Sequence, residues 1–340
     1  MNSGFDFPKI ELHLHLDGAI APSTLFRLAN ERKIELPAES AEDLVPYVVN
    51  DASCRSVNEY LTKFDLPTRV LQDSAALDTV AYELVLRLAA QGCGYAEIRF
   101  APQLHTQKLL CQSDAIAAVV SGVRRALAEC AGIKIGVILC CMALGGALLN
   151  REANLETVRL ASEMRDDIIR GIDLAGAEGL CPLEDYAELF DLAQELGVPF
   201  TCHAGDSQGP DTVRAAIERF GARRIGHGHH IAEDEELCKK AKNLGVTLEI
   251  CLTSNIQCET QPSFAEHPAK KLFDAGIAIT LSSDNPIIAD TTLEDEYRIA
   301  VEKCGFTHED IIDMNINAVR ASFMDEADKS RYIDRLRQFK

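Results

Sequence analysis

Residues 8–20 read PKIELHLHLDGAI. Residues 9–15 form a short apolar run that predicts a buried β-strand. His13 and His15 stand at its end. Residues two apart in a strand point to one face, so both imidazoles can reach a single metal ion. An HxH pair alone is a weak signal for a metal site. Such a pair also occurs on protein surfaces, or in a core where both rings have hydrogen-bond partners.

Seven further apolar runs with β-branched residues predict buried parallel strands. They are residues 95–101, 134–142, 168–174, 198–203, 223–227, 246–252 and 277–283. Helical patterns lie between them, for example at residues 78–90, 113–131, 183–196, 211–220, 233–244 and 268–275. Eight strands that alternate with helices, without a linker, predict one α/β domain over residues 1–340, a closed (β/α)₈ TIM barrel.

Two segments are longer than the alternating strand and helix pattern of a barrel requires. Residues 21–77 are too long for a strand-to-strand connection, so we expect a helical insertion after the first strand. Residues 307–340 are expected to form extra C-terminal helices. A doubly wound open sheet would need a Gly-rich phosphate loop after the first strand, and HLHLDGAIAP at residues 13–22 is not one.

The composition limits the classes of molecule that this protein can bind and the compartments in which it can reside. The net charge of −19 repels nucleic acid and anionic membranes but not a small neutral molecule. No apolar stretch is long enough for a membrane span, and residues 1–18 lack the pattern of a secretion signal. The 12 cysteines are scattered, which favours free thiols in a reducing compartment. We therefore expect a cytoplasmic protein; its oligomeric state is not predicted.

Polar residues at the ends of other predicted strands suggest a metal centre. His203 ends the fifth strand, His227 the sixth, and Asp284 follows the eighth. In a barrel these ends meet at one rim, where functional side chains lie. His13, His15, His203 and Asp284 form a plausible set for one Zn²⁺ that leaves a position for water, which zinc ionises near pH 7. His227 is left free to act as base or electrostatic stabiliser.

These residues resemble the adenosine deaminase family of the amidohydrolase superfamily. The resemblance covers nearly the whole chain, through PKIELHLHLDGAI, KFDLP, GYAEIRFAP, GIDLAGAE, HAGD, RIGHGHH and SSDNP in this order. It implies the same four zinc ligands, with His227 beside the metal-bound water. Seven ordered segments are far more specific than the HxH pair alone.

The resemblance also implies the substrate contacts. The backbone N–H of Gly176 would bind the purine ring, and Asp17 would reach the ribose 5′-hydroxyl. His15 would face the substrate as well as the metal, and Phe64 in the insertion would cover the entering purine. An Asp at position 17 is similar to the nucleoside enzymes, whereas adenine deaminases usually read HLEG.

Two positions depart from the family pattern. Family members usually read HAGE, and the glutamate delivers a proton to purine N1; here the motif is HAGD, and Asp206 reaches roughly 1–1.5 Å less. Asp206 is a compensated natural variant, a weakened acid, or a substitution that traps a ligand, and the sequence does not choose. Asn285 replaces a frequent second Asp; its NH₂ group can donate to purine N7.

The expected function is the zinc-dependent hydrolysis of adenosine to inosine and ammonia, with Asp206, His227 and Asp284 as catalytic residues. The alternatives are another 6-aminopurine substrate (adenine, an N6-substituted adenine nucleoside or 6-aminodeoxyfutalosine), or a catalytically impaired protein that binds purine nucleosides. A nucleic-acid editing deaminase is disfavoured, because its HxE…PCxxC zinc motif is absent and the chain is acidic.

Overall fold

A computed structural model describes residues 5–50, 54 and 56–340; residues 51–53 and 55 of the predicted insertion, and residues 1–4, lie outside the described part. The strands of the described part are β1 (Lys9–His15), β2 (Cys93–Phe100), β3 (Lys134–Ala143), β4 (Ile169–Gly176), β5 (Cys202–Ala204), β6 (Arg224–His227), β7 (Thr247–Ile250) and β8 (Ala278–Leu281). All neighbouring strands pair in parallel.

The strands form a closed ring, as predicted for a TIM barrel. Strands β1 to β4 form one four-stranded sheet and β5 to β8 another. Parallel bridges join the two sheets at both seams, Leu14 with Asp284 and Ile172 with Phe200. At the first seam, the His15 N–H donates to the Asp284 carbonyl at 2.8 Å. This seam therefore brings the end of β1 beside Asp284.

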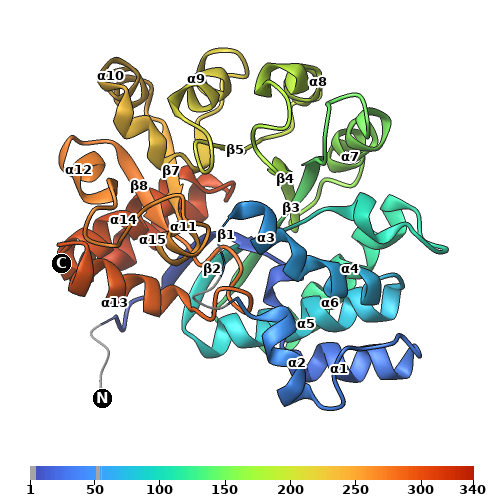
Figure 1. Cartoon of the computed structure of the whole chain (residues 1–340). Coiled ribbons are helices and arrows are strands. Elements are labelled where there is room, and N and C mark those ends of the chain that lie inside the picture. The colour runs from blue at the N-terminus through green and yellow to red at the C-terminus, as the bar shows by residue number, and fades with distance from the viewer. Residues whose placement is uncertain (1–4, 51–53, 55) are drawn as a thin grey trace.

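Helices surround the strands (Figure 1). Those of the described part are α1 (Pro22–Glu31), α2 (Ala41–Val48), α3 (Val57–Leu61), α4 (Asp65–Val70), α5 (Ser74–Ala90), α6 (Gln112–Glu129), α7 (Arg151–Glu163), α8 (Ala187–Glu195), α9 (Pro210–Glu218), α10 (Glu235–Leu244), α11 (Leu252–Gln257), α12 (Ala269–Asp274), α13 (Leu293–Lys303), α14 (His308–Ala321) and α15 (Glu326–Leu336). The predicted insertion contains α1 to α4, and the extra C-terminal helices are α14 and α15.

Several boundaries differ from the sequence prediction. Helix α5 begins at Ser74, because the Asp73 side chain caps it by accepting the Ala76 N–H, so the insertion ends before residue 77. Strand β5 begins only at Cys202, although residues 198–203 are apolar enough for a longer strand. Strand β7 ends at Ile250, and Leu252 begins α11. A continuous apolar run does not mark where a buried strand turns into a buried helix.

The core is continuous from the first strand to the last helix. Every residue of β2 is buried, as expected for a strand covered on both faces. One apolar cluster extends from Phe5 to Leu336. This continuity supports the prediction of a single domain over residues 1–340. Within the described residues, the helices are all too short or too polar to cross a bilayer.

Candidate active site

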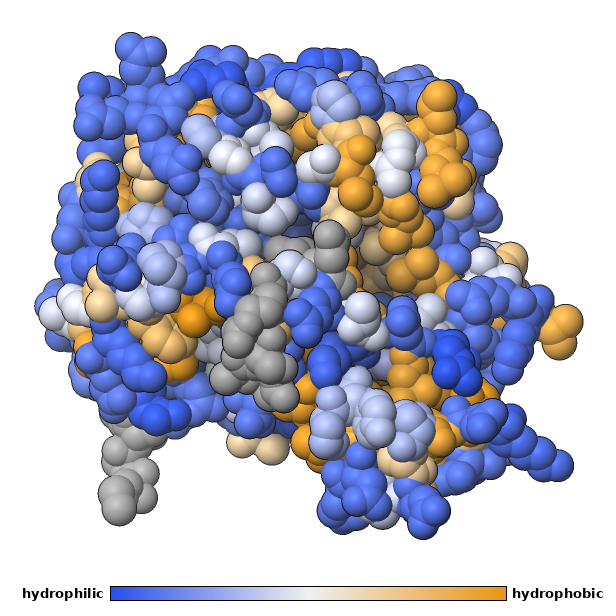
Figure 2. Space-filling view, in the orientation of Figure 1, coloured by the Kyte–Doolittle hydropathy of each residue, from blue (hydrophilic) through white to orange (hydrophobic). Residues whose placement is uncertain are grey.

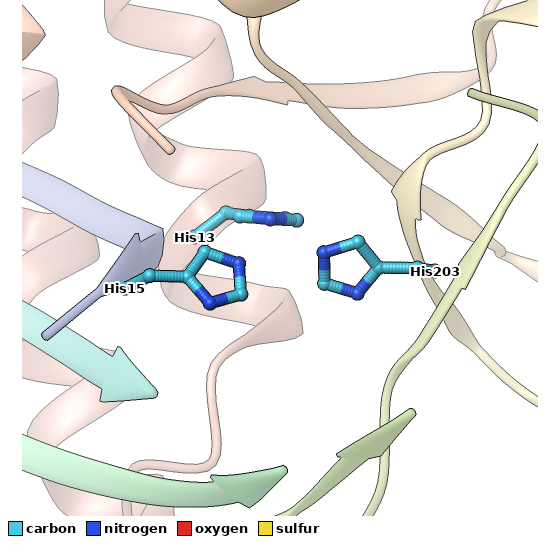
Figure 3. Close-up of side chains that lie close together, drawn as sticks. All are labelled: His13, His15 and His203. Atoms are coloured by element: carbon cyan, nitrogen blue, oxygen red, sulfur yellow. The ribbon is translucent and has the colours of Figure 1, made fainter. Parts of the chain in front are cut away.

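Three imidazoles converge at the rim of the barrel (Figure 3). His13 and His15 project from the end of β1, and His203 projects from β5. One ring nitrogen of each lies within 4.8 Å of the corresponding nitrogens of the other two. The strand spacing that places His13 and His15 on one face is therefore combined with a third imidazole from the other sheet.

Asp284 completes this cluster. Its Oδ1 lies 3.4 Å from both His13 Nε2 and His15 Nε2. Its Oδ2 accepts a hydrogen bond of 2.6 Å from the Ser254 hydroxyl. Burial alone would raise the pKa of Asp284, but its imidazole neighbours hold that pKa well below the usual range. The cluster thus combines three imidazoles with an ionised carboxylate.

The chemistry of this cluster fits a divalent metal ion. His13 Nε2 is buried, and the described residues offer it no hydrogen-bond partner. A buried polar atom without a partner is costly, and a metal ion would satisfy it. Burial lowers the pKa of His15 well below its usual value, so this imidazole is in the neutral form that binds metals. Three nitrogens and one oxygen are a donor set that suits Zn²⁺.

A competing triple uses the same His13. Ring nitrogens of His13 and His227 and the sulfur of Cys251 also lie within 4.8 Å of one another. Only a thiolate binds metal well, and burial raises the pKa of the Cys251 thiol well above its usual value. We therefore favour the set with His15, His203 and Asp284.

A layer of charged residues behind the cluster orients the imidazoles. His13 Nδ1 lies 3.0 Å from the Glu249 carboxylate of β7, and His203 Nδ1 lies 2.9 Å from Asp173 of β4. Arg99 of β2 donates to both carboxylates at 2.8 Å. Such carboxylate partners fix the tautomer and direction of metal-binding histidines.

Sequence reasoning missed this layer, although a signal for it was present. Asp173, Glu249 and Arg99 are charged residues inside otherwise apolar strands, and all three are fully buried. Charged side chains are almost never fully buried unless they are paired. Their presence in predicted core strands therefore pointed to a buried polar network near the predicted histidines.

Asp206 and His227 lie side by side next to the cluster of three imidazoles and Asp284. The Asp206 Oδ1 atom is 3.7 Å from His227 Nδ1, and Asn255 Nδ2 lies near both atoms, at 2.8 Å from Asp206 and 3.1 Å from His227. Burial lowers the pKa of His227 below its usual value, so the ring is neutral at pH 7. Asn255, which sequence reasoning did not single out, connects the two.

The loop that bears Asp206 is shaped by one carboxylate. Glu178 accepts hydrogen bonds of 2.6–3.0 Å from the backbone N–H groups of Gly205, Asp206, Ser207 and Gln208. It also accepts one of 2.6 Å from the Thr212 hydroxyl. Glu178 ends the GIDLAGAE motif, yet it had no predicted role. The backbone N–H groups of a loop that follows a strand need acceptors, and this need was the available signal for such a residue.

A pocket of about 630 Å³ opens above the cluster, within the usual size range of small-molecule sites. Its wall combines polar residues from several strand ends with apolar residues from the insertion. The predicted substrate contacts that line it are His15, Asp17, Phe64, Gly176 and Asn285, together with His203, Asp206, His227 and Asp284. Every predicted site residue except the fully buried His13 therefore borders one cavity.

The rim of this cavity is apolar on one side. In Figure 2, apolar side chains gather beside a hollow, on the part of this face that bears α7 and α8. Leu144 and Leu180 line the pocket and are 45% and 53% exposed. Exposed apolar side chains at a pocket mouth are suited to a flat, weakly polar ligand.

Two glycines make close packing in the site possible. A Cβ on Gly18 would lie 2.0 Å from Asn285 Oδ1, so the absence of a side chain leaves room for Asn285. Gly176 has φ +120° and a Cβ there would lie 2.5 Å from the Ala143 carbonyl.

Asp17 is buried, the described residues offer its Oδ1 no partner, and burial raises its pKa to about 6. An unpartnered carboxylate oxygen in the wall suits a ligand hydroxyl.

Comparisons with known proteins agree with this geometry. The sequence profile of the family described as adenosine deaminase matches residues 8–339. An adenosine deaminase of Haemophilus ducreyi is 40% identical over 332 residues, which cover 97% of this chain and 95% of the relative. This chain belongs to the adenosine deaminase family. A second family member, the adenosine deaminase of Enterococcus faecalis, is 35% identical over 95% of this chain and 94% of its own.

Solved structures show the same fold in related deaminases. The adenine deaminase of Arthrobacter aurescens is 26% identical and has a TM-score of 0.86. The match covers 98% of this chain and 98% of that chain. The N6-mAMP deaminase of Arabidopsis is also 26% identical with a TM-score of 0.86, over 99% of this chain and all of that one. Deaminases with this fold thus act on different 6-substituted purines.

Proposed function

We propose that this protein is a zinc-dependent hydrolase that converts adenosine to inosine and ammonia. The observation that carries the proposal is the convergence of three imidazoles and an ionised carboxylate around the unpartnered His13 Nε2, at the base of a pocket with Asp206 and His227. Family membership supports the same reaction. The reaction forms a C6–O bond, breaks the C6–N bond and releases ammonia.

His13, His15, His203 and Asp284 would hold one Zn²⁺, which lowers the pKa of water toward 7 and so makes a nucleophile available at neutral pH. The remaining residues would handle protons and position the purine. Asp206 would deliver a proton to N1, which makes C6 more electrophilic. This general acid role contributes typically about 10²–10⁴-fold in rate.

The pocket wall would hold the nucleoside. Gly176 and Asn285 would contact the purine edge, and Asp17 would accept a hydrogen bond from the ribose 5′-hydroxyl. Phe64, which packs beside Tyr60 in the insertion, would cover the ring. These assignments are supported by the place of each residue in the pocket wall.

The test is an ammonia and ultraviolet assay on zinc-loaded protein with adenosine. We expect turnover by the wild type and a loss of about 10²-fold or more in Asp206→Asn. Asp206→Glu reports on the shorter side chain: unchanged or lower activity indicates that the site is built around aspartate. Recovery only in Asp206→Glu would mark Asp206 as a defect, and no turnover in either protein would remove adenosine as the substrate.

The second candidate is a different 6-aminopurine: adenine, an N6-substituted nucleoside or nucleotide, or 6-aminodeoxyfutalosine. The acidic wall favours a neutral sugar. Asp17 and Asp65 line the pocket, and among the described lining residues Arg69 is the single Lys or Arg. We expect adenosine to exceed both adenine and N6-methyl-AMP in kcat/KM. Nucleoside affinity without ammonia release from any of these would instead favour the binding-protein alternative.

A cytoplasmic location is proposed on separate grounds. Apart from Cys54, the cysteines are free thiols, including the adjacent Cys140 and Cys141. Free thiols in this number are typical of a reducing compartment.

A further inference from the structure

We infer that His267 and Asn255 are positioning residues that hold His227 with its ring proton on Nε2, facing the pocket, and leave one oxygen of Asp206 free. This inference rests on the proposed function, because His227 and Asp206 act in that reaction. It concerns two side chains outside the metal cluster and the pocket wall. A chain of hydrogen bonds, whose first donor is unambiguous, links these side chains.

The chain begins at a backbone amide. The Ala269 N–H, near the start of α12, donates to His267 Nδ1 at 3.1 Å. A backbone N–H can only donate, so Nδ1 must be the bare, accepting nitrogen. His267 is 5% exposed and burial lowers its pKa to about 3, so the ring is neutral. A neutral ring with bare Nδ1 has its proton on Nε2.

The protonated Nε2 of His267 orients the Asn255 amide. His267 Nε2 lies 3.2 Å from Asn255 Oδ1, and the contact is favourable only with the amide oxygen on this side. The amide NH₂ group then faces the opposite way. Its two protons meet two acceptors, Asp206 Oδ1 at 2.8 Å and His227 Nδ1 at 3.1 Å. Asn255 is fully buried, so water cannot substitute for these partners.

This arrangement decides the tautomer of His227. Because Asn255 donates to Nδ1, that nitrogen is bare, and a ring with a bare Nδ1 has its proton on Nε2. Nε2 lies on the other edge of the ring, and His227 borders the pocket. His227 therefore offers an N–H donor to an oxygen in the pocket. Of the two roles open to it, the geometry favours electrostatic stabiliser over resting-state base.

The same amide assigns the two oxygens of Asp206 to different tasks. Oδ1 accepts from Asn255 at 2.8 Å, and the Thr260 hydroxyl, which also lies 3.0 Å from the Asn255 carbonyl, is 3.3 Å away. A carboxylate oxygen that already accepts a hydrogen bond from a buried amide is the less available one for a proton. The proton for the purine is therefore held on Oδ2. Tethering also reduces the freedom of a side chain that is one methylene shorter than the usual glutamate.

The first test reads the tautomer directly, without substrate. Zinc-loaded protein labelled with ¹⁵N-histidine is studied by long-range ¹H–¹⁵N correlation NMR, and the His227 signals are assigned from their loss in His227→Asn. We expect a bare Nδ1 and a protonated Nε2. In Asn255→Asp the new carboxylate cannot donate, so we expect Nδ1 to gain a proton. A protonated Nδ1 in the wild type would overturn the inference, as would an unchanged pattern in Asn255→Asp.

The second test uses a matched pair at His267. Both variants lose the acceptor for the Ala269 N–H, but His267→Gln keeps a side-chain N–H for Asn255 Oδ1 and His267→Phe does not. We expect kcat to fall on the order of 10- to 100-fold in His267→Phe, with KM little changed, and to be largely retained in His267→Gln. Equal loss in both variants would indicate a packing role and overturn the inference.

The two proposals fail in different ways. Absence of ammonia release from every purine removes the deaminase function, while the NMR pattern of His227 still reports on the hydrogen-bond chain. Deamination by a wild type whose His227 has its proton on Nδ1 removes the inference alone. Zinc content and thermal unfolding of each variant verify that it is folded and loaded.

Discussion

His227 and Asp284 both have a left-handed backbone, with φ of 59° and 58°. For residues other than glycine this conformation costs on the order of 1–3 kcal/mol and persists only where the surroundings enforce it. Asp284 is held by the β1 seam through backbone bonds to His13 and His15. At the scale of single residues, the site is therefore strained in places and fixed by its neighbours.

Gly176 is predicted to tolerate no side chain. In Gly176→Ala, the added Cβ would meet the Ala143 carbonyl and the φ of +120° would be strained, so the backbone proposed to contact the purine must shift. A shift of about 1 Å costs on the order of 10²-fold in kcat/KM. Gly132→Ala is the control, because it has φ +93° but open space around it. Similar kinetic losses in both variants would argue against a close contact at Gly176.

Asp173→Asn is predicted to weaken metal binding. The change removes the carboxylate beside His203 Nδ1, although the asparagine has the same shape. Burial alone would lower the pKa of His203, and Asp173 outweighs it and raises that pKa. We expect zinc affinity to fall on the order of 10- to 100-fold, measured by chelator competition. The exposed Asp191→Asn is the control, and unchanged affinity in Asp173→Asn would show that the carboxylate does not support the metal site.

At the scale of elements, strands bring the proposed metal ligands together, and short helices position the side chains around them. Helix α11 directly follows β7 and contributes both Ser254, which binds Asp284, and Asn255, which binds Asp206. Helix α13 packs beside α11 through Glu296, whose carboxylate accepts the Thr253 N–H at 3.2 Å. The position of α11 thus depends on an acid buried in a neighbouring helix.

This acid predicts a pH dependence of stability. Burial raises the pKa of Glu296 from 4.5 to about 7. The folded state holds the proton more tightly, so this contribution to stability is full below pH 4.5 and is lost as the pH rises through about 7. Between pH 5 and pH 8 we expect a loss on the order of 2 kcal/mol in the free energy of unfolding.

The measurement is urea unfolding of zinc-loaded protein at several pH values. Glu296→Gln, which stays neutral, should show a flatter dependence, and the comparison removes the pH dependence of metal binding that both proteins share. Equal slopes in the two proteins would mean that Glu296 ionises normally in the folded state.

At the scale of the whole molecule, the proposed metal ligands come from parts of the barrel that are distant in sequence. His13 and His15 come from the first strand, His203 from the fifth, and Asp284 follows the eighth. An ion bound to all four would therefore crosslink both sheets of the ring. Any ligand that binds only the folded state stabilises it, by about 2.7 kcal/mol at a concentration 100 times Kd.

Removal of the metal is predicted to lower the thermal unfolding midpoint. Zinc-loaded and chelator-treated wild type are compared by calorimetry, and added zinc should restore the higher midpoint. His13→Ala is the control, because without this ligand the midpoint should respond little to chelator. A wild-type midpoint that is insensitive to chelator would contradict a tightly bound ion that joins the two sheets.

The sequence by itself predicted the barrel and the side chains that gather at one rim of it. Alternating strand and helix patterns are local, and parallel strands place their C-terminal ends at one rim, so a polar residue at each end was enough to predict a shared site. The pair of His13 and His15 needed only the two-residue period of a strand. The expectations for His203, His227 and Asp284 followed from the same rule.

Only the tertiary structure decided which partners orient these residues. Glu249 lies 236 positions from His13, and Asn255 lies 49 positions from Asp206, so neither contact has a local signature. These hydrogen bonds arise when the ring closes and packs its helices, because a buried polar atom must then find a partner across the barrel. The reach of Asp206 and the proton position on His227 are therefore properties of the folded molecule.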